Sequence, residues 1–120
     1  MPRETRQIIL SDEELLQAIR SYRRVRPAVL PQGDILSTSL ETIEGGHTRL
    51  NVVVQMRYGT SQLEAVIGLQ EADLLALLIR FCLENNVPVP RRGEKSVASM
   101  DGEVALLVSF ATNLASPEEA

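Results

Sequence analysis

Several residue types are scarce in this chain of 120 residues. Tryptophan is absent, only two tyrosines and two phenylalanines occur, and cysteine, histidine and lysine occur once each. The hydrophobic core must therefore be built from Leu, Val, Ile and Ala, and we do not expect the exposed aromatic rings on which nucleic-acid bases stack. The single Cys82 excludes an intramolecular disulfide and fits a reducing compartment.

Long apolar runs are missing as well. The longest covers residues 74–83, is interrupted by Arg80, and is shorter than the roughly 20 residues that cross a bilayer. Residues 1–7 are polar and lack the apolar centre of a signal peptide. The net charge of −4 disfavours bulk attraction to nucleic acid or to an anionic membrane. These features predict a cytoplasmic protein without membrane contact.

What is present is the composition of one ordinary globular domain, 44% hydrophobic and 23% charged. We expect a flexible leader at residues 1–10, a single α+β domain at residues 11–110 and a flexible tail at residues 111–120. The element order α-β-β-β-α-β-β predicts an antiparallel sheet of about five strands with both helices on one face.

The first helix is expected over residues 11–26. Ser11 and Glu14 form a capping-box pattern, and Leu10 and Leu15 occupy the two positions of a hydrophobic staple. Apolar residues then recur at helical spacing, and Pro27 ends the helix.

A β-hairpin is expected around a tight turn at residues 59–60. This turn pairs Tyr58 with Ser61, and the resulting register sets apolar residues opposite one another, as with Met56 and Leu63. The agreement between turn length and apolar pattern supports the hairpin.

The preceding hairpin turns at residues 44–46. A two-residue turn there would set Leu50 against Glu41, which is a poor match. A three-residue loop with a left-handed glycine instead pairs Leu40 with Leu50 and Leu36 with Val54, and we prefer it.

The second helix is expected over residues 70–86. It is apolar around nearly its whole circumference, so the first helix, the sheet or a partner subunit must cover it on several sides. The Asp101-Gly102 pair then predicts a type I′ turn between the last two strands. The final strand has two fairly apolar faces, which places it in the interior of the sheet.

No catalytic group stands out. We interpret His47, beside the glycines at residues 45–46, as a solvent-exposed turn residue, because a catalytic histidine needs a nucleophile or an orienting carboxylate. We interpret Cys82 as a core residue. One Cys and one His do not provide four zinc ligands. The sequence thus predicts neither an enzyme nor a cofactor or metal site.

Basic residues are the clearest binding candidates. One cluster lies at the end of the first helix and the other follows the second helix. If the two helices were parallel, both clusters would meet at one end of the domain and form an anion site. The two clusters are Arg20, Arg23, Arg24 and Arg26, and Arg91, Arg92 and Lys95.

Three functions compete on the sequence alone. The leading prediction is a small non-enzymatic binding or regulatory module that acts through protein contacts and forms homo-oligomers, because the second helix and the final strand carry more apolar surface than one chain covers. The alternative is an anion- or nucleic-acid-binding domain that uses the two basic clusters. An enzyme with a cleft around His47 comes third.

Overall fold

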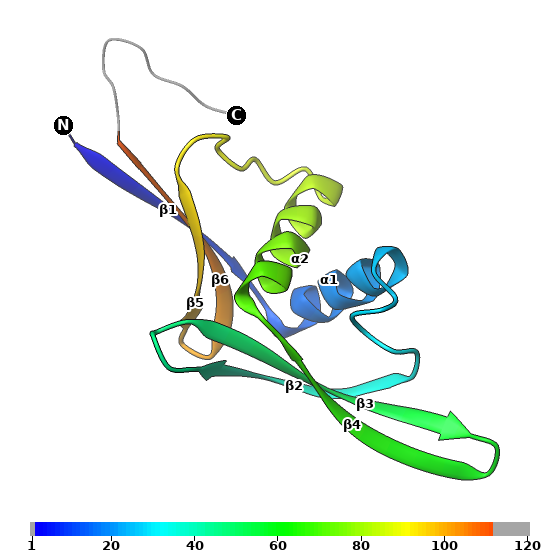
Figure 1. The fold of residues 1–120 in the computed structure, drawn as a ribbon. Helices are drawn as coiled ribbons and strands as arrows, with labels where there is room; N and C mark the ends of the chain where they lie inside the picture. Colours follow the sequence, from blue (N-terminus) through cyan, green and yellow to red (C-terminus); the bar gives the residue numbers. More distant parts are fainter. Residues whose placement is uncertain (1, 112–120) are drawn as a thin grey trace.

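The computed structural model describes residues 2–111, which form two helices and six strands (Figure 1). The α+β class is confirmed. Ala111 ends the last strand, and residues 112–120 of the expected tail lie outside the described residues. In chain order the elements are β1 (Arg3–Leu10), α1 (Asp12–Val25), β2 (Asp34–Thr42), β3 (Thr48–Tyr58), β4 (Ser61–Leu69), α2 (Glu71–Glu84), β5 (Glu94–Met100) and β6 (Glu103–Ala111).

The strands form two three-stranded antiparallel sheets, so the prediction of one sheet of about five strands is wrong. We call β1, β6 and β5, in that order, the terminal sheet, and β2, β3 and β4 the middle sheet. The sheets meet where the Thr48 hydroxyl donates to the Val97 carbonyl at 3.4 Å. Local patterns define each hairpin, whereas the junction between hairpins depends on tertiary packing that no local pattern encodes.

β1 is the strand that the sequence analysis did not foresee. Arg3–Leu10 pairs with β6 along its length, from Arg3 opposite Ala111 to Leu10 opposite Val104. The residues expected as a leader outside the domain therefore form an edge strand within it. Their three charged side chains obscure the alternation of apolar and polar residues that is typical of a strand. β6 lies between β1 and β5, which confirms the interior position expected for it.

The hairpin of β3 and β4 has the predicted register. Tyr58 pairs with Ser61, and the pairing continues without a shift to Leu50 opposite Leu69. The turn between β5 and β6 is also as predicted, because Asp101 and Gly102 have positive φ angles of 53° and 84°, as a type I′ turn requires.

The hairpin of β2 and β3 agrees with the prediction only near its turn. Leu40 pairs with Leu50, and the Ile43 amide bonds to the His47 carbonyl across the three-residue loop. The predicted pairing of Leu36 with Val54 is wrong, because a β-bulge shifts the register and sets Ile35 opposite Val54. The bulge leaves the Leu36 side chain exposed.

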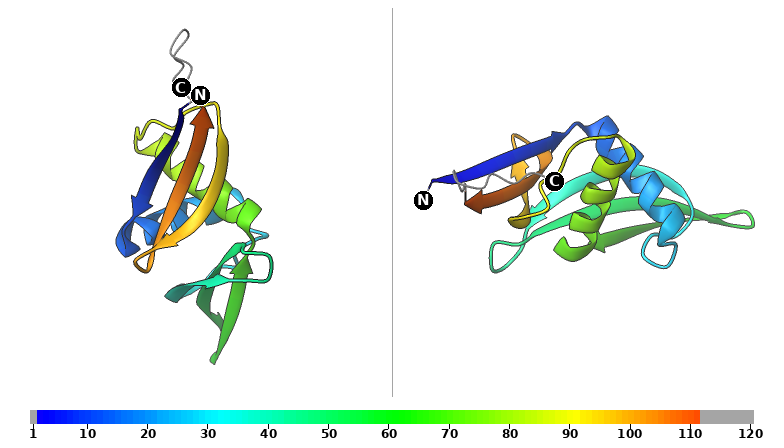
Figure 2. Two further views of the ribbon diagram at one scale, coloured as in Figure 1. Left: turned by 90° about the vertical axis from the view of Figure 1, so that its left-hand side faces the viewer. Right: turned by 90° about the horizontal axis from the view of Figure 1, so that it is seen from above.

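The helices begin and end close to where the sequence predicts. The Glu14 amide donates to Ser11 Oγ at 3.2 Å and the Ser11 amide donates to the Glu14 carboxylate at 2.9 Å, so the capping box is present. Both helices lie on the same side of the strands, and α2 touches strands of both sheets (Figures 1 and 2).

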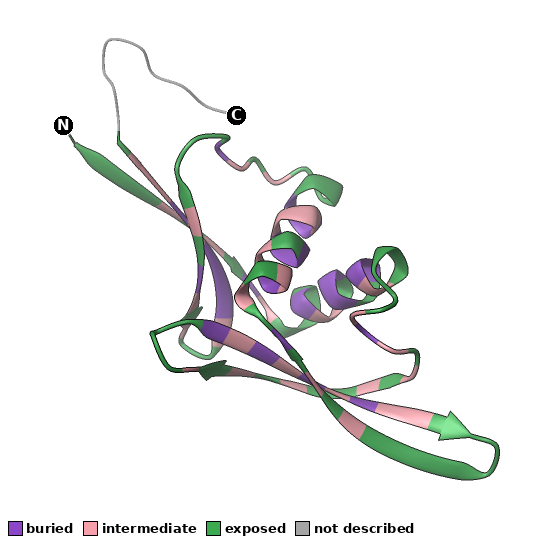
Figure 3. Cartoon of the chain, viewed as in Figure 1, coloured by how far each residue is buried: buried purple, intermediate pink, exposed green. Residues whose placement is uncertain are grey.

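The core fills the angle between the helices and the two sheets. Its side chains come from every helix and from β1, β3, β4, β5 and β6 (Figure 3). The fully buried larger side chains are Leu10, Ile19, Leu30, Leu50, Val52, Val54, Leu69, Leu74, Leu77, Leu78, Val104 and Leu106.

Candidate protein-interaction surface

Two hydrogen bonds connect α1 with α2 and thereby set which face of α2 points inward. The Ser21 hydroxyl donates to Glu84 Oε1 at 2.6 Å, and the Tyr22 hydroxyl donates to Asp73 Oδ1 at 2.8 Å. Burial raises the pKa of Tyr22, the Asp73 carboxylate raises it further, and Arg26 opposes the shift. The inward face of α2 consists of Leu74, Leu77, Leu78, Phe81 and Cys82.

The opposite face of α2 is also apolar. Ala72, Ala76 and Leu83 are exposed, whereas Leu75 and Ile79 are half-buried and pack against the core at its edge; we call these five residues the outer stripe of α2. Leu83 is the most exposed of the large apolar residues described, at 72%. The helix expected to be covered on several sides therefore leaves Ala72, Ala76 and Leu83 exposed within this chain (Figure 3).

The outer face of α1 provides an internal comparison. Residues 13, 17, 20 and 24 of α1 have the same spacing as residues 72, 76, 79 and 83 of α2. The α1 positions are all exposed and hold Glu13, Gln17, Arg20 and Arg24. A helix that faces water in this protein thus carries charged and polar side chains, and the outer stripe of α2 departs from that rule.

Arg80 lies next to this stripe. Its Nη2 is 3.3 Å from Glu84 Oε2 on the next turn of the helix. Its Nε is buried and has no hydrogen-bond partner among residues 2–111. A buried donor without an acceptor is costly, so this atom lowers the stability of the chain.

The structure places the two basic clusters in different regions. The C-terminal end of α1 lies apart from the connector between α2 and β5 in Figure 1 and in both views of Figure 2, and the helices are not parallel. Arg23 donates to the Gly33 carbonyl at 2.8 Å and so holds the connector after α1. Lys95 reaches the Arg91 carbonyl at 3.3 Å. The described structure therefore does not bring the seven basic residues into one site.

His47 has a carboxylate partner that the sequence analysis missed. Its Nδ1 is 2.6 Å from Glu71 Oε2, across the gap between the β2–β3 turn and the first turn of α2. The side chain of His47 is 65% exposed, in agreement with the expected turn position. An exposed pair of this kind joins two elements and contributes little stability. The neighbour is far along the chain, so no local signal could have identified it.

Cys82 is buried in the core, as expected. Burial raises the pKa of its thiol, which keeps the thiolate, the reactive form, scarce at neutral pH. Within residues 2–111, no group of three or more His, Cys, Asp or Glu side chains is placed to hold a metal ion.

The outward face of the terminal sheet is a second surface without a helix over it (Figure 2, left). It mixes apolar side chains with polar and charged ones, so it is less apolar than the outer stripe of α2. From the register its residues are Arg3, Thr5, Gln7, Ile9, Glu94, Ser96, Ala98, Met100, Glu103, Ala105, Leu107, Ser109 and Ala111.

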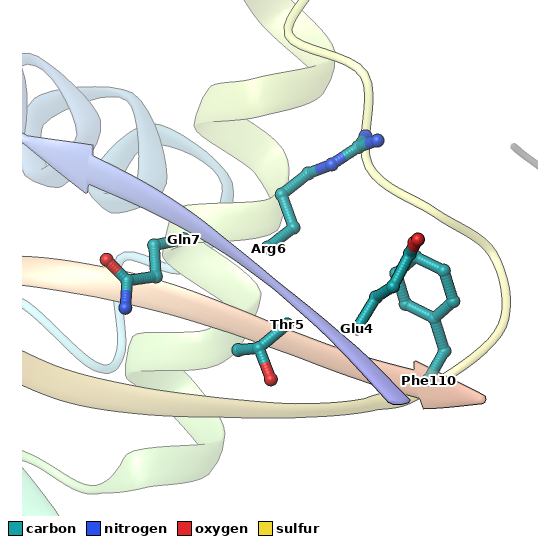
Figure 4. A pocket seen from close by; sticks show the side chains of 5 residues that line it. All are labelled: Glu4, Thr5, Arg6, Gln7 and Phe110. Carbon is teal, nitrogen blue, oxygen red and sulfur yellow. The ribbon is translucent and has the colours of Figure 1, made fainter. Parts of the chain in front are cut away.

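A hollow follows β1 beside this face. It is lined by Glu4, Thr5, Arg6, Gln7 and Phe110. Figure 4 shows these side chains on both sides of the strand rather than directed at a common point. Ligand pockets need convergent polar groups in a concave wall, and this hollow does not provide them.

Neither helix in the described part of the chain is long and apolar enough to cross a membrane. The protein-family models, curated proteins and solved structures compared with this chain include no match to it.

Proposed function

We propose that this chain is a small non-enzymatic binding or regulatory module that acts through protein contacts and self-associates. The outer stripe of α2 is the observation that carries the proposal. Apolar side chains that gather on one exposed helix face are typical of interaction sites, whereas scattered ones are ordinary.

The composition of the stripe favours a second copy of α2 as the partner. Ala72 and Ala76 have small side chains, so another helix can approach closely, and Leu83 offers an apolar anchor. Two copies related by a two-fold axis would place stripe against stripe.

The test is the oligomeric state of the whole chain. Sedimentation velocity over a range of concentrations should show the wild type assembling beyond the 13.2 kDa of one chain. The double substitution Ala76→Glu with Leu83→Glu should give a smaller species at every concentration, because it places carboxylates in the contact.

A matched control uses the same helical positions in α1. The substitutions Gln17→Glu and Arg24→Glu lie on a face that already faces water, so this variant should assemble as the wild type does. A wild type that remains monomeric at every concentration would overturn the self-association part of the proposal.

A further inference from the structure

Three of the four outer sheet edges carry features that discourage pairing with another strand. β1 has Arg3, Glu4 and Arg6 along its edge, and β5 has Lys95 and lies beside β3 at Val97. β2 is interrupted by the bulge between residues 35 and 37. Charged side chains, bulges and neighbouring elements are the usual means by which proteins protect an open strand.

The fourth edge, β4, has fewer of these features than the other three. Ser61–Leu69 pairs with β3 without a register shift, contains no proline or basic residue, and has Glu64 as its one charged side chain. Leu63 is 54% exposed and Val66 is 66% exposed. A long edge without a bulge and with exposed apolar side chains is a template for another strand.

The hairpin geometry determines which backbone groups of β4 point outward. Residues that flank a two-residue turn exchange hydrogen bonds, and bonded pairs alternate with non-bonded pairs along the strands. Tyr58 and Ser61 flank the turn, so the odd-numbered residues of β4 bond to β3. The even-numbered residues, Gln62, Glu64, Val66 and Gly68, therefore present their N–H and C=O groups to the open edge.

β4 is self-complementary about a two-fold axis at Ala65. This axis sets Glu64 opposite Val66 of the other strand and Leu63 opposite Ile67. Outward backbone groups then meet outward groups, and apolar side chains meet on the inner face. An axis at Glu64 would instead oppose two carboxylates, which is destabilising.

We infer that β4 pairs with β4 of a second copy of this chain, antiparallel and about a two-fold axis at Ala65. The pairing joins two middle sheets into one continuous sheet. It rests on the proposed function, because it requires a chain that self-associates. Together with the α2 contact it gives each chain two different two-fold contacts, so copies assemble beyond the dimer.

Cross-linking through Ala65 tests the register directly. In a non-hydrogen-bonded pair the two Cα atoms are about 4.5 Å apart, within the range that a disulfide bridges. Under mild oxidation the Ala65→Cys variant should form a reducible dimer. The control Ser61→Cys lies on the same strand, but its two copies would be separated by eight residues, roughly 26 Å at 3.3 Å per residue. Equal cross-linking rates for the two variants would overturn the inference.

Sedimentation of edge and helix variants separates the two contacts. Val66→Glu places a carboxylate opposite Glu64 of the other strand, and like charges directly opposite each other destabilise a strand pair. Ser39→Glu places the same charge on β2, at the opposite edge of the same sheet. We expect Val66→Glu to stop at a dimer held by α2, and Ser39→Glu to behave as the wild type does. The helix variant with glutamates at positions 76 and 83 should stop at a dimer held by β4, and the combined variant should be monomeric.

These outcomes distinguish the two proposals. If Val66→Glu assembles as far as the wild type while the helix variant does not, the β4 pairing is wrong and the proposed α2 contact stands. If the helix variant assembles as the wild type does while Val66→Glu is monomeric, the α2 contact is wrong and the β4 pairing stands.

Discussion

The Tyr22 side chain shows how one residue couples the two helices. Its ring is buried in the core, and its hydroxyl donates to Asp73 on α2. Because a buried phenolate beside a carboxylate is unfavourable, the pKa of Tyr22 is higher in the folded chain than the ordinary value of 10.0. The contribution of this shift to stability is present in full below pH 10 and is lost as the pH rises through the folded pKa.

Replacing Tyr22 tests this coupling. Tyr22→Phe should lower the free energy of unfolding by about 1 kcal/mol below pH 10, since it removes one hydrogen bond. The variant should also lose the part of the alkaline decline that comes from Tyr22. Urea unfolding at pH 8 and at pH 10.5 measures both effects. Tyr58→Phe, at an exposed tyrosine, is the control, and an unchanged alkaline decline in the Tyr22 variant would contradict the assignment.

Residues that act through local backbone chemistry were predictable from the sequence. Ser11 and Glu14 cap α1, and Asp101 and Gly102 close the last hairpin, because each pattern is completed within a few residues. The partner of His47 was not predictable, since Glu71 approaches it only through the packing of α2 on the middle sheet.

At the scale of elements, β1 departs most from the sequence-based expectation. Its inner positions alternate correctly for a strand, with Leu10 buried and Ile8 half-buried. Charged side chains at Arg3, Glu4 and Arg6 obscure the alternation in the sequence. The strand depends on pairing with β6, which lies at the other end of the chain. Local pattern is weak for edge strands because only one face is buried and only one side is paired.

Two substitutions in β1 separate a strand from a leader. Ile8→Ala should lower the free energy of unfolding by about 2 kcal/mol, because the side chain packs against the core. Gln7→Ala, on the opposite face, should change it by less than about 0.5 kcal/mol. Chemical unfolding measures both, and equally small effects would show that β1 adds nothing to the domain.

α2 illustrates what the sequence could and could not specify about the candidate site. The sequence predicted that this helix is apolar around its circumference. It also predicted that one sheet face is not enough to bury the helix. The orientation of the helix was not readable, because it depends on the hydrogen bonds of Ser21 and Tyr22 to residues more than fifty positions away. The outer stripe could be identified only once that orientation was known.

At the scale of the whole molecule, the two basic clusters lie in separate regions of an acidic protein. Charges that do not share a ligand contribute independently, so any binding to a polyanion should divide additively between the clusters. We expect the wild type to elute from a heparin column at low salt. The double variant Arg20→Glu, Arg24→Glu and the double variant Arg91→Glu, Arg92→Glu should each elute at a slightly lower salt concentration than the wild type. The fourfold variant should show the sum of the two shifts. A shift well beyond that sum would indicate a shared site.

The pairing in the terminal sheet also affects the order in which the strands fold during synthesis. β2, β3 and β4 are neighbours in the chain and can pair as soon as they leave the ribosome, whereas β1 has to wait for β6, the strand synthesised last among those described. Sequence-distant pairing of this kind is slow, because the entropy of closing a long loop must be overcome first. A nascent chain therefore leaves β1 unpaired until β6 arrives, and this interval is when it most needs shielding from other unfolded chains.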